Sequence, residues 1–107
     1  MMSSIPIDLK KVKKEDLDCE ILRVGMIAEL DAVSLYEQLA AMTENTNLKK
    51  ILLDIAKEEK THVGEFQALL LKMDKEQEKE LEEGKEEVEE LTKWKFIDYG
   101  NHKSRES

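Results

Sequence analysis

Two long segments with helical apolar periodicity, separated by five polar residues, constrain the fold of this chain most. Apolar residues recur at helical spacing from about Glu15 to Met42 and again from about Leu48 to Lys72. The five residues between them, Thr43-Glu44-Asn45-Thr46-Asn47, have side chains that compete for backbone hydrogen bonds, and Asn47 is a suitable N-cap for the second segment. Because the connection is so short, the sequence predicts an antiparallel two-helix hairpin.

The first segment has an unusually wide apolar face. Its central stripe consists of Leu22, Met26, Val33, Tyr36 and Ala40, flanked by Ile27, Leu30 and Leu39. The second segment carries one stripe, formed by Leu48, Leu52, Ile55, Val63, Phe66, Leu69 and Leu70. A surface helix of a small monomer needs only one stripe, so the wide face predicts burial against more than one neighbour.

The remainder of the chain contributes less to a core. A short third helix is predicted to begin at Asp74, with Gln77 as its capping partner, and to extend through Leu91. Its Glu- and Lys-rich residues 76–90 predict a solvated face. We therefore expect a flexible arm over residues 1–14, a helical domain over 15–91 and a tail over 92–107, in which Trp94, Phe96, Ile97 and Tyr99 form a short apolar segment.

Composition narrows the class of protein. The chain is 40% apolar and 39% charged, with four glycines and one proline, which is typical of all-α proteins. Its net charge of −8 argues against nucleic acid as a partner. No apolar run is long enough for a membrane span, and no secretion signal is visible, so we expect a cytoplasmic protein. The single cysteine, Cys19, rules out a disulfide within the chain, and a domain of 107 residues favours association.

A candidate metal site begins with Glu59 and His62. Residues three apart share one face of a helix, so both side chains can reach one ion. Both stand on the apolar stripe, beside Val63, and are therefore expected to point into the core. The other histidine, His102, lies in a polar tail and is expected to be solvated, and Cys19 is expected to be an ordinary thiol.

Glu29 completes the candidate site from the first helix. It occupies an apolar slot between Met26 and Val33, and an unpaired carboxylate in such a slot is costly unless a cation accompanies it. Glu29 lies 15 residues before Glu44, and Glu59 lies 15 residues after it. Residues equidistant from the turn of a hairpin lie at similar height, so Glu29, Glu59 and His62 should converge.

These three residues are half of a known ligand set. A di-iron four-helix bundle uses one Glu from each of two helices and a Glu-x-x-His from each of the other two. Two-fold pairing of hairpins would supply the whole set, in a ferritin-like bundle with one iron per chain. Oxygen donors with two imidazoles suit iron or manganese better than zinc. The alternative is a hairpin with partly exposed polar residues at the edge of an oligomer.

The sequence also resembles the encapsulated ferritins, two-helix ferritin-like proteins housed in encapsulin nanocompartments. The similarity covers about residues 15–91 and is strongest at residues 27–36 and 58–62. It aligns the metal-binding residues of that family with Glu29, Glu59 and His62, at the same separation between the two glutamates. The resemblance implies an iron-oxidising centre at a homodimer interface, a ring of dimers that is decameric in the family, and storage of the iron by an encapsulin shell protein.

The same resemblance assigns two further residues and shows two departures. Tyr36 matches a tyrosine near the family's centre, and Asp31 matches one acidic residue of an outer site where iron enters. Ala28 and Leu35 stand where some relatives have glutamate and tryptophan. Residues 93–107 do not resemble the docking peptide of encapsulin cargo, although in some relatives the domain is fused to its shell protein.

The leading functional hypothesis is a ferroxidase that oxidises Fe(II) to Fe(III) with dioxygen or peroxide. Glu29, Glu59 and His62 would bind the iron. A rubrerythrin-like peroxidase is the second hypothesis, but such proteins usually add a rubredoxin-type cysteine site, and this chain has one cysteine. The third is a helical interaction module without metal.

Overall fold

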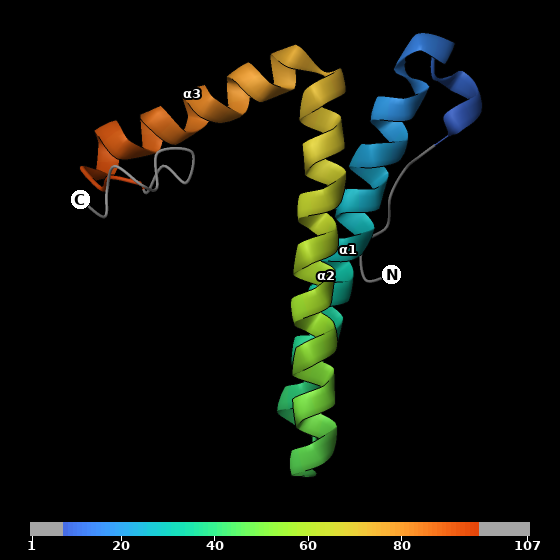
Figure 1. Cartoon of the computed structure of the whole chain (residues 1–107), viewed down its shortest axis with the longest axis vertical. Helices are drawn as coiled ribbons and strands as arrows, with labels where there is room; N and C mark the ends of the chain where they lie inside the picture. The colour runs from blue at the N-terminus through green and yellow to red at the C-terminus, as the bar shows by residue number, and fades with distance from the viewer. Residues whose placement is uncertain (1–7, 97–107) are drawn as a thin grey trace. The chain divides into compact units, whose positions relative to one another are not determined.

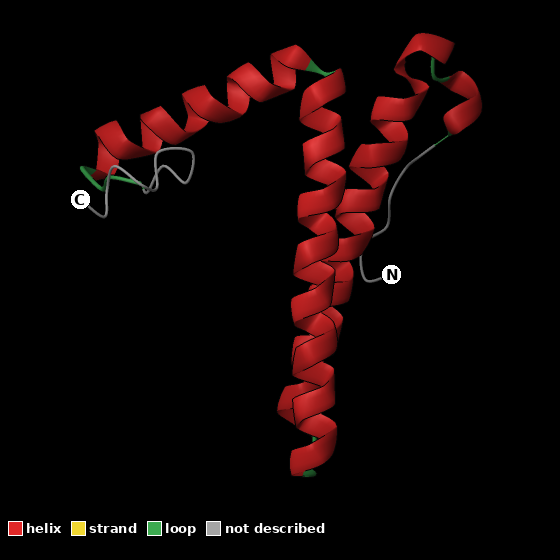
Figure 2. Cartoon of the chain, in the orientation of Figure 1, coloured by secondary structure: helices red, strands yellow, loops and turns green. Residues whose placement is uncertain are grey.

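The computed structural model describes residues 8–96, and that part of the chain is helical with no strand (Figure 2). Two short 3-10 turns, Leu9–Lys11 and Lys14–Asp16, precede three α-helices: α1, Leu17–Met42; α2, Thr46–Met73; and α3, Lys75–Thr92. The all-α prediction is confirmed. Within this part, none of the helices combines the length and apolarity that crossing a bilayer requires.

The described residues form two units, which divide between Asp74 and Lys75. The first unit contains α1 and α2, and the second contains α3. The domain boundaries expected at residues 14/15 and 91/92 stay predictions.

Helices α1 and α2 form the predicted antiparallel hairpin and lie side by side (Figure 1). The buried seam consists of Leu22, Val33 and Ala40 from α1 with Ala56 and Leu70 from α2. The two alanines are the most deeply buried of these, and their small side chains allow the helices to approach closely. Burial of each larger side chain contributes about 1.5–3 kcal/mol, so this seam holds the hairpin together.

Much of the predicted apolar face remains on the surface of the single chain. Met26 and Tyr36 are half-buried, whereas Ile27, Leu30 and Leu39 are exposed, Leu30 at 54%. Leu48 and Leu69 of α2 are also exposed, unlike the rest of their predicted stripe. The hairpin therefore covers one seam and leaves several large apolar side chains of both helices on the surface of the single chain.

The turn between α1 and α2 is shorter than the sequence predicts. It consists of Thr43, Glu44 and Asn45, and α2 begins at Thr46 rather than Leu48. Asn45 is the N-cap: its backbone is extended, and its Oδ1 accepts a hydrogen bond of 3.0 Å from the N–H of Leu48. The prediction that Asn47 is the N-cap was wrong. Thr43 Oγ1 accepts a hydrogen bond of 3.1 Å from the N–H of Asn45, which closes the turn two residues earlier.

Replacing the N-cap tests this assignment. Asn45→Ala removes the side-chain acceptor for the N–H of Leu48 and should lower the free energy of unfolding by about 1 kcal/mol. Asn47→Ala is the matched control, because Asn47 lies inside the first turn of α2 and is exposed. Urea unfolding of both variants at one protein concentration makes the comparison. An equal or larger loss in Asn47→Ala would contradict the assignment.

An ion-pair cluster fastens the far end of the hairpin. The Arg23 guanidinium of α1 donates hydrogen bonds to Glu20 Oε1 at 2.9 Å and to the carboxylate of Asp74. Asp74 follows the last residue of α2, and its N–H donates to the carbonyl of Leu70. The open end of the hairpin thus has an ion pair from α1 to the end of α2 in addition to the buried Leu22 and Leu70, and the turn connects the helices at the other end.

Helix α3 is strongly acidic and begins at Lys75, one residue after the predicted start. Its apolar side chains Leu81, Val88 and Leu91 are all exposed, in agreement with a solvated helix. The neighbouring Glu83 carboxylate, which is the main cause, raises the pKa of Glu80 by like-charge repulsion. Of the predicted apolar tail segment, Trp94 and Phe96 are exposed, whereas Ile97 and Tyr99 lie outside the described residues, as does His102.

Candidate metal centre

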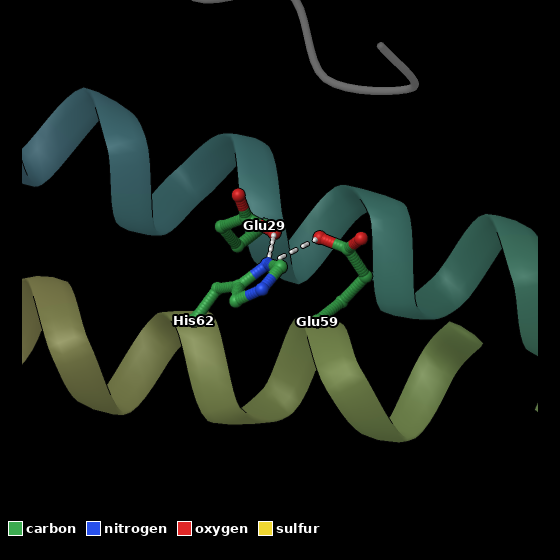
Figure 3. Close-up of side chains that lie close together, drawn as sticks. All are labelled: Glu29, Glu59 and His62. Atoms are coloured by element: carbon green, nitrogen blue, oxygen red, sulfur yellow. Dashed lines mark hydrogen bonds and ion pairs between the residues drawn. The ribbon is translucent and has the colours of Figure 1, made fainter. Parts of the chain in front are cut away.

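The three residues predicted to bind metal lie together on the hairpin (Figure 3). Glu29 comes from α1, and Glu59 and His62 come from adjacent turns of α2. One ligand atom from each lies within 4.8 Å of the other two. His62 Nδ1 stands 3.3 Å from Glu29 Oε2 and 3.4 Å from Glu59 Oε2. The imidazole therefore faces both carboxylates at once.

The register of the turn brings them together. Glu44 is the middle residue of the three-residue connection, and Glu29 and Glu59 each lie 15 residues from it. Two antiparallel helices that rise equally per residue place such positions at one height. His62 follows Glu59 by three residues, so it shares the same face of α2 one turn on.

The site is half-buried rather than fully inside the hairpin. The side chains of Glu29 and Glu59 are 21% and 19% exposed, and that of His62 is 44% exposed. The expectation that Glu59 and His62 point into the core is thus only partly met in the single chain. The buried seam is occupied by aliphatic side chains, so the three polar residues lie along its edge.

The local charge favours a cation. Among the described residues, neither Glu29 nor Glu59 forms an ion pair with a lysine or an arginine, and Lys60 pairs instead with Glu37 of α1 at 3.2 Å. A single Nδ1 hydrogen can point directly at only one of the two carboxylates. Two partly desolvated carboxylates that share one imidazole therefore leave negative charge uncompensated, which a bound cation would neutralise.

The separations between the three groups also fit a metal ion. Bonds of about 2.1 Å to a divalent ion place neighbouring ligand atoms about 3.0–3.5 Å apart. The distances of 3.3 and 3.4 Å from His62 Nδ1 to the two carboxylate oxygens fall in that range. Two carboxylates and one nitrogen can hold one ion and leave further coordination positions open.

A hollow of about 290 Å³ adjoins the site on the side away from the turn. It is lined by Glu29, His62, Glu65, Phe66 and Leu69. The sequence assigned Phe66 and Leu69 only to a core stripe and gave Glu65 no role. The hollow leaves room beside Glu29 and His62 for groups from outside the chain, which would complete the coordination of a metal.

The other two predicted site residues lie apart from this group. Asp31 and Tyr36 are half-buried on α1, two and seven residues after Glu29. Within residues 8–96 no second set of three or more His, Cys, Asp and Glu side chains converges in this way. Cys19 is a half-buried free thiol.

Sequence comparison relates this chain to known proteins. A model of the rubrerythrin family matches residues 20–103. The chain is 61% identical over 83 residues to a ferritin-like-encapsulin shell fusion protein of Pyrococcus furiosus, which covers 78% of this chain and 24% of that protein. It is 38% identical over 56 residues to an encapsulin nanocompartment cargo protein, EncC, of Myxococcus xanthus, which covers 52% of this chain and 43% of that protein. The chain thus spans less than half the length of either relative.

Structural comparison agrees. The crystal structure of the encapsulated ferritin domain from Pyrococcus furiosus matches with a TM-score of 0.77 and 52% sequence identity. The match covers 90% of this chain and the whole of the other. It supports the ferritin-like architecture predicted from the sequence.

Metal binding by the three residues can be tested without any redox chemistry. His62→Ala and Glu29→Ala each remove a direct ligand, so the affinity for Co(II) should fall by more than the roughly 10–100-fold that loss of an outer-shell partner costs. His102→Ala and Glu58→Ala are matched controls, because Glu58 is an exposed neighbour of Glu59 and His102 is the other histidine. Optical titration with Co(II) measures the affinities. Wild-type affinity in His62→Ala would refute the site.

Proposed function

This chain belongs to the rubrerythrin family and to the encapsulated ferritins, and from that premise we propose that it is a ferroxidase that oxidises Fe(II) to Fe(III). The observation that carries the proposal is the convergence of Glu29, Glu59 and His62 from two helices, with no lysine or arginine paired to either carboxylate among the described residues. Fe(II) is the substrate. The two glutamates supply oxygen ligands and His62 supplies nitrogen, a set suited to iron.

One chain supplies half of a di-iron site, so the proposal includes a homodimer. A second copy related by a two-fold axis would bring another Glu29, Glu59 and His62 against the first set. Leu69 of α2, an exposed apolar residue that lines the hollow together with Glu29 and His62, supports an interface on this side of the hairpin. The dimer would hold two irons, one per chain, with one glutamate from each chain bridging them.

The pairing of two irons matches the electron count of the reaction. Two Fe(II) and one O2 with two protons give two Fe(III) and one H2O2, so each iron gives up one electron. Four carboxylates carry a charge of −4, against +4 for two Fe(II) and +6 for two Fe(III). The four carboxylates would stabilise the oxidised product more than the substrate, because Coulomb attraction scales with the charge of the ion.

Iron storage with an encapsulin shell extends the proposal. One relative is named as a fusion to an encapsulin shell and another as encapsulin cargo. We propose an encapsulin shell protein as partner, location inside a cytoplasmic nanocompartment, and dimers assembled in a ring, a decamer by resemblance. Asp31 and Tyr36 are included as candidates for the surroundings of the site and the approach of iron, because both lie on α1 within two turns of Glu29.

The match to the rubrerythrin model favours one other candidate, reduction of peroxide. Peroxidases of that kind usually receive electrons through a rubredoxin-type cysteine site, whereas Cys19 is the only cysteine of this chain. Oxygen consumption separates the two. A ferroxidase consumes dioxygen as it oxidises Fe(II), whereas a peroxidase turns over only when peroxide is supplied.

Iron oxidation in air tests the proposed activity directly. Wild-type protein should oxidise Fe(II) faster than buffer, with about one iron bound per chain, and Glu29→Ala and His62→Ala should both return the rate to that of buffer. Ultraviolet absorbance follows Fe(III) formation, with Glu58→Ala as the control that keeps the activity. A wild-type rate equal to that of buffer, with no bound metal, would leave only the helical interaction module.

The coupling of metal and assembly is a separate prediction. Four converging carboxylates repel one another when no cation lies between them, so Fe(II) should shift the chain from smaller species toward the dimer and larger rings. Analytical ultracentrifugation under nitrogen, with and without Fe(II), measures the size distribution. Glu29→Ala, which halves the number of glutamates at the site, should assemble with little dependence on Fe(II). Identical distributions for the wild type in both conditions would contradict the coupling.

A further inference from the structure

A close contact between the two helices lies one turn from the metal centre. The far end of the Phe66 ring from α2 rests against the backbone of Gly25 in α1. A Cβ built on Gly25 would stand 3.2 Å from three atoms of that ring. The ring therefore occupies the notch that the missing side chain leaves.

The positions of these residues connect the contact to the metal ligands. Gly25 precedes Glu29 by four residues on α1, and Phe66 follows His62 by four residues on α2, so each lies one turn from a ligand on the same face. Phe66 also lines the hollow together with Glu29 and His62. The Gly25–Phe66 contact therefore lies one helical turn along the hairpin from Glu29 and His62.

Gly25 differs from the other described glycines, Gly64 and Gly84, because only at Gly25 would a Cβ meet a neighbouring side chain. Glycine is the least favourable residue in a helix interior apart from proline, and α1 runs for 26 residues through this point. Its conformational freedom is not used there, because among the described residues no glycine has a positive φ. The effect of glycine at this position is therefore the space left by the absent side chain, and the Phe66 ring fills that space.

We propose that Gly25 and Phe66 are positioning residues of the metal centre: the ring seated in the notch sets the distance between α1 and α2 at the layer of Glu29 and His62. The proposal rests on the proposed function, because it assumes that the triad binds iron. Only Glu29 comes from α1, so its distance to His62 depends on the spacing of the two helices. A Cβ on Gly25 requires the Phe66 ring to give by a few tenths of an ångström, and under the proposal α2 shifts with the ring and changes the distance from Glu29 to His62.

Substituting Gly25 tests the proposal, and the chain offers a close control. Gly25→Ala should weaken Co(II) binding on the order of 10-fold, as loss of a supporting residue around a metal site does, and should alter the intensity of the Co(II) absorption bands. Gly64→Ala is the matched control: it lies in α2, two residues after His62, and a Cβ there meets nothing within 4 Å. It should leave affinity and spectrum unchanged.

A second substitution separates positioning from stability. Phe66→Leu in the Gly25→Ala background shortens the side chain that meets the new methyl group, so it should recover part of the lost affinity. Thermal unfolding of the metal-free variants is measured alongside, and a purely structural role would change the unfolding temperature without changing the Co(II) spectrum. If Gly25→Ala does not fold, Phe66→Leu alone decides, because loss of the ring should also weaken binding.

The outcomes distinguish the two proposals. Wild-type protein that binds neither Co(II) nor Fe(II) refutes the proposed function. Wild-type protein that binds metal, with Gly25→Ala identical to Gly64→Ala in affinity and spectrum, overturns only the positioning role. The positioning role is likewise overturned if Phe66→Leu, tested alone, retains wild-type affinity and spectrum.

Discussion

The candidate site depends on the register of one short turn. Three residues connect α1 and α2, and with Glu44 at their centre Glu29 and Glu59 stand at equal distances along antiparallel helices. A connection longer or shorter by one residue would rotate one helix by about 100° relative to the turn and separate the ligands along the axis. The Asn45 cap and the Thr43 hydroxyl fix where the turn closes. Local hydrogen bonds at the end of the hairpin thus determine chemistry four turns away.

The same arrangement places a destabilising feature at the edge of the core. Two half-buried glutamates face one imidazole, and no lysine or arginine of the described residues compensates them. Replacing them with apolar residues would favour the hairpin, since burying uncompensated carboxylates costs free energy. The aliphatic seam, along whose edge the site lies, supplies the apolar burial that offsets that cost.

Most of the hairpin and the site could be predicted from the sequence, for identifiable reasons. The apolar periods gave the helices to within two residues, and the position of Glu29 among apolar neighbours marked it for a special role. The cap was missed because Asn45 and Asn47 have the same side chain, and they are distinguished only in the structure, where Asn45 donates to the Thr43 hydroxyl and accepts from the N–H of Leu48. The exposure of Leu48 and Leu69 was missed because a period identifies a face but not its width. The Gly25–Phe66 contact joins residues 41 positions apart, and its only sequence signal was a glycine inside a helical pattern.

The half-exposed state of His62 agrees with the proposal that two chains share the site. A site completed inside one hairpin would need all its ligands in the seam, but two helices in contact leave no room there for two metals and their ligands. Ligands for an interface must instead stand beside the seam, partly covered by their own chain and open toward the next. Glu29, Glu59 and His62 have that intermediate exposure, and the exposed Leu69 lines the hollow beside Glu29 and His62. Partial burial of these three residues, which differs from a simple core prediction, is therefore the arrangement that the proposed pairing of two chains requires.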